Sequence, residues 1–166
     1  MGDCMVKKFH SELDELKEDV QNMGKLARDM LKESIAALKK QDTELAEETI
    51  SKKEEIENVD REIEIKALHL ATLYLPMAKD MRTIACILKM ITYLTRVGLY
   101  GKDISKSVLE LSGKPHISKL VSIPYMAETV CGMIEDALEA FDTENIALFE
   151  DFDERDDTVD AFQNSI

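Results

Sequence analysis

One long amphipathic segment, residues 76–111, constrains the fold of this chain more than any other stretch. Its apolar residues and glycines recur at alternating steps of three and four, which places them on one stripe of an α-helix. The stripe consists of Ile87, Met90, Leu94, Val97, Gly101, Ile104, Val108 and Leu111. It is widened by Ile84, Leu88, Ile91 and Gly98. So wide a stripe needs more than one neighbour, and we expect this to be the central helix of an all-α fold.

Two more long helices are expected before it. Residues 6–40 repeat apolar side chains at the same helical spacing. Asp42 then offers an N-cap for a second helix, which we expect to continue without a break to Pro76. Short connections between long helices make them antiparallel neighbours, so the three should form an up-down-up bundle. Gly113 and Pro115 are the stop signals after the third helix.

After residue 113 the pattern starts again. Pro124 can open a fourth helix, and Asp142 precedes a fifth as Asp42 precedes the second. A shift of 103 residues pairs Leu45 with Leu148, Glu47 with Glu150, Ile56 with Val159 and Ile63 with Ile166. We therefore predict tandem three-helix bundles, residues 1–113 being the first and 114–166 a partial second. The long third helix has no counterpart before Ile166, so we expect either a truncated polypeptide or another covering for that face.

Short motifs in the central helix resemble a known family. Pro76, then the segment 80–82 (Asp-Met-Arg), then the segment 96–98 (Arg-Val-Gly) resemble the PhoU family, whose repeat carries a P-x-x-x-D-L-R turn and an L-E-R-x-G-D segment. PhoU proteins consist of two three-helix units, so the resemblance covers most of the chain and implies the same all-α fold. It also places Asp80 and Arg82 in the family's turn motif. The alternative for these two residues is helix capping and a weak surface ion pair.

The resemblance further implies metal-binding positions, and here the chain departs from the family. Thr95 and Leu99 stand where the family has the acids of its E-x-x-x-D motif, and neither is a strong metal ligand. The matching positions on the preceding helix are Lys53 and Glu57, so one acid remains there. We therefore expect no tightly bound metal in the first bundle.

In the second repeat, two acids match the family's D-x-x-x-D ligands. Asp156 and Asp160 are four residues apart and so lie on one helical face. With further ligands from a facing helix they can bind a divalent or ferric metal, iron or zinc. The candidate metal ligands of the chain are thus Asp156, Asp160 and Glu57. The alternative is that this acidic stretch is a solvated surface.

Charge and cysteine content narrow the function further. The formal net charge of −13 leaves no basic stripe for phosphates, so we predict no nucleic-acid binding. The sequence has no unbroken apolar run of about 18 residues and no signal peptide, so we expect a cytoplasmic protein without direct membrane insertion. The odd cysteine number favours reduced thiols, and we expect Cys86 and Cys131 to lie in the core.

Enzyme motifs are missing from the sequence. None of the histidines follows a Glu at the spacing of a di-iron site, and neither a phosphate-binding G-x-x-x-x-G-K-[ST] loop nor H-E-x-x-H occurs. We predict no enzymatic activity. The PhoU resemblance instead implies a regulator of phosphate uptake and phosphate signalling, with a transporter ATPase or a sensor histidine kinase as partner. The alternatives are a metal-binding (iron or zinc) helical bundle and a structural dimerisation module.

The two helices of the second repeat both carry apolar stripes, which two helices alone cannot enclose. Large exposed apolar patches are rare on soluble monomers. We therefore expect a homodimer in which these helices pack against those of a second copy. The alternative is that they fold back onto the first bundle at Ile84, Leu88 and Ile91.

Overall fold

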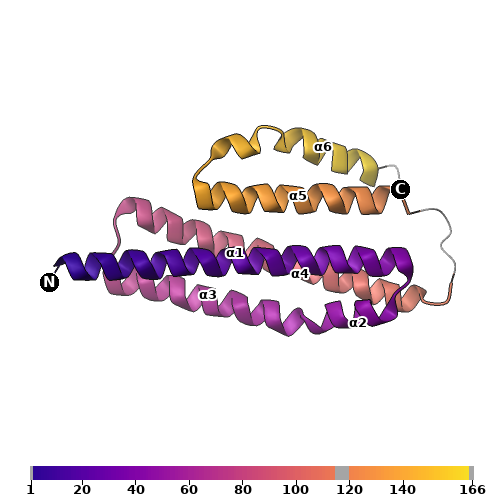
Figure 1. Ribbon diagram of the computed structural model, residues 1–166, viewed down its shortest axis with the longest axis horizontal. Coiled ribbons are helices and arrows are strands. Elements are labelled where there is room, and N and C mark those ends of the chain that lie inside the picture. The colour runs from indigo at the N-terminus through magenta and orange to yellow at the C-terminus, as the bar shows by residue number, and fades with distance from the viewer. Residues whose placement is uncertain (1, 115–119, 165–166) are drawn as a thin grey trace.

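All regular structure is helical in the computed structural model, which describes residues 2–114 and 120–164. The prediction of an all-α fold of long antiparallel helices is therefore confirmed (Figure 1). The elements are α1 (Gly2–Lys40), α2 (Thr43–Ser51), α3 (Lys53–Tyr74), α4 (Ala78–Leu111), α5 (Ser122–Thr143), the short 3-10 helix η1 (Ile146–Phe149) and α6 (Phe152–Gln163).

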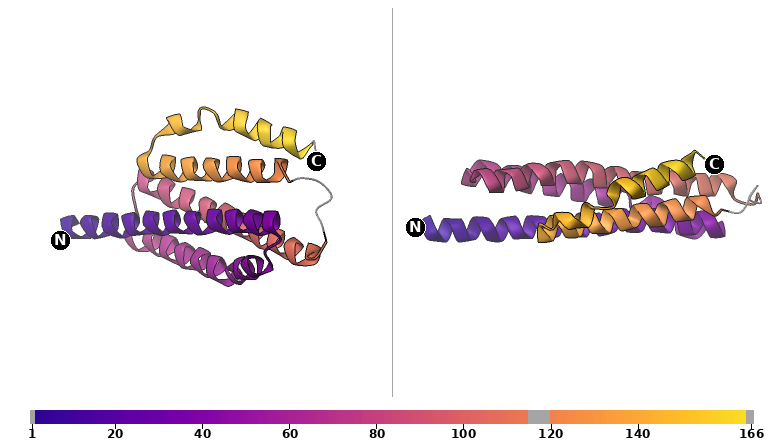
Figure 2. Two further views of the ribbon diagram at one scale, coloured as in Figure 1. Left: turned by 45° about the vertical axis from the view of Figure 1, so that its right-hand side comes forward. Right: turned by 90° about the horizontal axis from the view of Figure 1, so that it is seen from above.

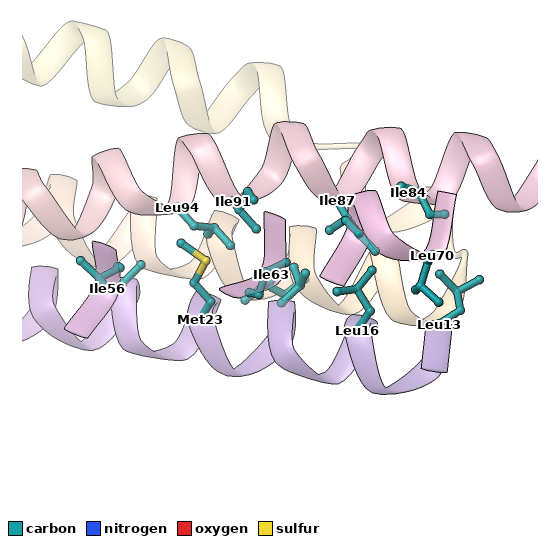
Figure 3. Close-up of a cluster of buried hydrophobic side chains, with 14 of the residues drawn as sticks. Leu13, Leu16, Met23, Ile56, Ile63, Leu70, Ile84, Ile87, Ile91 and Leu94 are labelled. Carbon is teal, nitrogen blue, oxygen red and sulfur yellow. The ribbon is translucent and has the colours of Figure 1, made fainter. Parts of the chain in front are cut away.

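Helix α4 lies at the centre of the first bundle, where it contacts α1, α2 and α3. Its apolar stripe is buried or partly buried as the spacing predicts, except for Leu111 at its end, which is exposed. Figure 3 shows Ile87 and Leu94 facing the side chains of α1 and α3. The core of this bundle includes Leu13, Leu16, Met23, Met30, Ile56, Ile63, Leu70, Ile84, Ile87, Ile91 and Leu94. By length and composition α4 could also cross a membrane. In this fold, however, its apolar stripe packs against other helices.

At Gly101 two helix backbones come close together. A Cβ atom added at Gly101 would lie 2.7 Å from the carbonyl oxygen of Met30 on α1, so no larger residue fits without a backbone shift. At Gly98 the nearest atoms belong instead to the side chains of Ile56 and Met30. The glycine at position 101 therefore lets α1 and α4 pack at a distance that a side chain would prevent.

The predicted second helix is divided in two, which corrects the expectation of an unbroken helix. Asp42 caps its start as predicted, since the Asp42 carboxylate accepts a hydrogen bond from the Leu45 N–H at 3.0 Å. At Lys52 the backbone N–H bonds to the Thr49 carbonyl, three residues back, and α3 begins at Lys53. Glu33 of α1 binds the Lys52 ammonium at 2.6 Å. No glycine or proline marks this break, so no local signal predicts it.

Helix α5 runs beside α1, and α6 runs beside α5 (Figures 1 and 2). Leu138 of α5 sits over Gly24 of α1, where an added Cβ would lie 2.4 Å from a Leu138 methyl group. Gln21 donates a hydrogen bond to the Leu138 carbonyl at 2.7 Å. The second repeat thus folds back on the first bundle mainly through α1. The stripe named for the alternative fold-back was wrong, because Ile84 and Ile91 are buried in the first bundle's own core.

The two cysteines expected in the core differ. Cys131 is buried in α5, as predicted. Cys86 is exposed on α4, so that prediction was wrong. The reason is geometric. Cys86 lies two residues after the buried Ile84, so its side chain points about 200° around the helix axis from that of Ile84, away from the core.

Candidate functional site

The family turn motif forms the connection between α3 and α4. Leu75 ends α3 in the left-handed backbone region, with φ of 47°, and Pro76 and Met77 lead into α4. Asp80 lies in the first turn of α4, where the helix dipole favours a carboxylate. The Nε2 atom of His10 on α1 lies 4.0 Å from the Asp80 carboxylate. The turn therefore holds Asp80 near α1.

Arg82 points to a different neighbourhood from Asp80, and the described residues include no ion pair between them. Arg82 lines a hollow of about 390 Å³ between α1, α4 and α5, together with Lys17, Lys79, Thr83, Cys86, Ala140, Phe141 and Glu144. At its edge the Lys79 ammonium lies 3.1 Å from the Glu144 carboxylate. Asp80 lines a smaller apolar hollow of about 140 Å³ around Phe9, Tyr74 and Leu75. The two motif residues, Asp80 and Arg82, thus line two different hollows.

The metal positions of the first repeat carry other chemistry here. The Thr95 hydroxyl donates a hydrogen bond to the Asp60 carboxylate of α3 at 2.8 Å. The Lys53 ammonium lies 3.4 Å from the Glu57 carboxylate. A hydroxyl and an ammonium thus stand at positions where the family resemblance implies acids. The remaining acid, Glu57, forms an ion pair with Lys53. Sequence reasoning missed Asp60, which it could have found one turn beyond Glu57 on the same helical face.

The second-repeat acids lie far from Glu57 in the fold. Asp156 and Asp160 are exposed on α6, which packs against α5. Glu57 belongs to α3, which packs against α1, α2 and α4. Within the residues that the structure describes, no group of three or more His, Cys, Asp or Glu side chains could hold a metal. The fold therefore brings two of the three candidate ligands together and leaves the third on another helix.

Two charged junctions attach α5 and α6. The Glu135 carboxylate accepts hydrogen bonds from Lys32 and Arg28 of α1, each at 3.0 Å. The hydrogen bond from Lys32 and the two positive charges lower the pKa of Glu135, although partial burial opposes them. Arg155 of α6 binds the Asp136 carboxylate of α5 at 2.6 Å. These pairs orient the second repeat around its small apolar contact with α1.

The chain matches the PhoU domain over residues 20–108 and 123–166. It is 34% identical over 161 residues to the phosphate-specific transport system accessory protein PhoU homolog of Clostridium acetobutylicum, covering 96% of this chain and 74% of that protein. A homolog of the same description from Aquifex aeolicus is 33% identical, with 96% of this chain and 72% of that protein covered. The chain therefore belongs to the PhoU family.

Solved structures agree with this assignment. The phosphate transport system regulatory protein PhoU from Streptococcus pneumoniae superimposes with a TM-score of 0.85 at 26% identity, over 95% of this chain and 74% of that one. PhoU from Pseudomonas aeruginosa gives a TM-score of 0.89 at 23% identity, which shows the shared fold, over 95% of this chain and 76% of that one. The resemblance inferred from the turn motif is thus confirmed at the level of fold and family.

Proposed function

We propose that this chain is an accessory regulator of a phosphate transport system that acts by protein–protein contact and catalyses no reaction. The observation that carries the proposal is family membership. The relative from Clostridium acetobutylicum, 34% identical over 96% of this chain, is described as an accessory protein of such a system. The partner would be the transporter's ATPase subunit or a sensor histidine kinase, which places the chain in the cytoplasm.

The shape of the molecule supports a contact function. Helix α4 has 34 residues and leaves a row of them exposed along its length. The outward side of α3 also exposes Ile65 and Leu68, one turn apart on the same face. Long helix faces of this kind are the surfaces by which helical proteins recognise partners.

The test is a gene deletion in the organism that encodes the chain, followed by uptake of radiolabelled phosphate in phosphate-rich medium. We expect uptake to rise without the chain and to return to normal when it is supplied again. Co-purification with the tagged transporter ATPase subunit or sensor kinase then identifies the partner. Normal uptake in the deletion strain, together with no co-purification, would contradict the proposal.

The geometry does not favour a metal-binding bundle as the main function. Two exposed carboxylates, Asp156 and Asp160, leave most of a metal's coordination sphere to water. We keep these two residues as proposed ligands for any metal that purifies with the chain. Elemental analysis should show that Asp156→Ala with Asp160→Ala removes it. Stoichiometric metal that survives both substitutions would show that the ligands lie elsewhere.

We also propose that the chain self-associates through its second repeat. Tyr125, Ile146 and Phe149 are large exposed apolar or aromatic residues on α5 and η1. Sedimentation equilibrium should give a dimer at micromolar concentration, and Phe152→Asp should weaken it. A monomer that is unchanged by this substitution would leave the fold-back on α1 as the only contact of the repeat.

A further inference from the structure

The charge of helix α4 is opposite to that of the rest of the chain. The whole sequence has 34 Asp and Glu against 21 Lys and Arg. Residues 81–102 nevertheless contain no acid, and their bases are Arg82, Lys89, Arg96 and Lys102. A segment of about six helical turns without one carboxylate is unusual in so acidic a chain. It marks one surface whose charge differs from that of its surroundings.

The bases follow a seven-residue repeat on the outer side of α4. Arg82, Lys89 and Arg96 are spaced by seven residues. A second set with the same spacing is offset from them by four residues: Cys86, Tyr93 and Tyr100. The residues of both sets are exposed, and together they form a surface that we call the α4 seam: Arg82, Cys86, Lys89, Tyr93, Arg96 and Tyr100. Five of them follow a core residue of α4 by two positions, about 200° around the axis. The seam therefore lies opposite the buried stripe.

The positive charges of the seam lack acidic partners within the described residues. Arg82 and Lys89 make no ion pair there. The Arg96 guanidinium donates a hydrogen bond to the Tyr100 hydroxyl at 3.0 Å and lies 6.0 Å from the centre of the Tyr100 ring. Tyr93 and Tyr100 are 62% and 53% exposed. The seam thus offers two exposed aromatic rings and bases that form no ion pair with a carboxylate of the described residues; Glu144, which lines the same hollow as Arg82, is paired with Lys79.

A helix is the occupant that matches this pattern. Residues at alternating steps of three and four form one line along a helix, which is the geometry of paired helices. In the seam every second position of this line is a base, so the facing positions of a partner helix would need carboxylates. The seam runs for roughly 27 Å, or about five turns. A second copy of α4 would set bases against bases, and like charges across an interface disfavour pairing. The seam also lacks the Leu, Phe or Trp face of a membrane-surface helix.

We propose that the α4 seam docks an acidic amphipathic helix of a partner protein. Carboxylates at every seventh residue of that helix would meet Arg82, Lys89 and Arg96, while apolar side chains between them would cover Tyr93 and Tyr100. This goes beyond the proposed function, because it rests on the α4 surface alone and specifies the chemistry of the partner. The seam can dock such a helix whether or not the partner protein belongs to a phosphate transporter.

The test uses the full chain and a synthetic peptide of about four heptads with Glu at every seventh position and Leu between. A matched peptide carries Lys in place of Glu. Fluorescence anisotropy should show binding of the acidic peptide at low salt, weaker binding at high salt and none of the Lys peptide. Lys89→Glu with Arg96→Glu should weaken binding at least about tenfold. Circular dichroism confirms that the variant is folded.

The matched control is Lys25→Glu with Lys106→Glu, which reverses two exposed bases outside the seam. It should change binding less than about threefold, because it alters the same net charge elsewhere. Tyr93→Ala should also weaken binding without altering any charge. No binding of the acidic peptide, or an equal loss in seam and control variants, would overturn the proposal. Binding to phosphatidylglycerol vesicles but not to the peptide would overturn it in favour of a lipid surface.

Discussion

The first four helices and the α5–α6 hairpin bury their apolar residues to very different extents. The first bundle has fully enclosed side chains on every helix, among them Leu16, Met30 and Ile87. In the hairpin, the described residues of η1 and α6 include none that is buried, and α5 contributes Cys131, Leu138 and Ala140. The first region therefore encloses a core of its own, whereas the second depends on another region for its burial.

That other region is α1. Ile134, Leu138 and Phe141 of α5 pack against the core of the first bundle, so the hairpin extends this core rather than forming one. Polar contacts from Gln21 and Arg28 of α1 surround this small apolar contact. The difference teaches that similar apolar patterns in the sequence do not ensure similar burial. Helix α6 has no buried residue among those described, and α5 buries its apolar residues on the first bundle.

The largest effect is expected from the first core. Ile87→Ala removes a side chain that is 0% exposed between α1, α3 and α4, and such changes cost about 2–5 kcal/mol of unfolding free energy. Thermal unfolding followed by circular dichroism should show the whole helical signal melting earlier. Ile65→Ala, at an exposed site on α3, is the control and should change the midpoint little. Similar losses in both variants would mean that α4 is not the centre of the core.

An intermediate effect is expected at the junction between the two regions. Gly24→Leu places a side chain where Leu138 now sits, and overpacking of this kind costs about 1–3 kcal/mol. Because the new group faces α5, proteolysis should increase in α5 and α6 while the first bundle stays protected. Adding Leu138→Ala makes room and should restore part of the protection. Uniform sensitivity along the chain would contradict a local junction.

The smallest effect is expected from pH. Since the pKa of Glu135 is lowered in the folded chain by Lys32 and Arg28, its contribution is present above the pKa of the unfolded chain and is lost as pH falls through the folded value. The group is 46% exposed, so solvent screening limits the effect to about 1 kcal/mol or less. Acidification should thus loosen α5 slightly before the first bundle melts. In Glu135→Gln this step should disappear, and its persistence would assign it to other groups.

The sequence predicted the helices better than their contacts. Helical spacing identified the buried stripe of α4, and the side chain of Asp42 identified the start of α2, because both signals are local. At the break, Lys52 binds Glu33 from another helix, and Leu138 packs on a glycine more than a hundred residues earlier. Such contacts between distant segments leave no periodic trace, so the fold-back onto α1 could not be placed.

The candidate sites divide in the same way. Thr95 and Leu99 could be recognised from the sequence as poor metal ligands. The hydrogen bond from Thr95 to Asp60 required the packing of α3 against α4. Likewise, the sequence shows that Asp156 and Asp160 share a face, but only the fold shows that Glu57 lies on a helix that packs elsewhere.

Native-state hydrogen exchange tests the central comparison most directly. We predict that amides of α5 and α6 exchange through a smaller opening free energy than those of residues 84–98 in α4, because the hairpin can leave α1 while the first core stays folded. Increasing denaturant should then expose the hairpin first and the first bundle last. Equal opening free energies and a single cooperative transition for all helices would contradict this account and show that the two regions share one core.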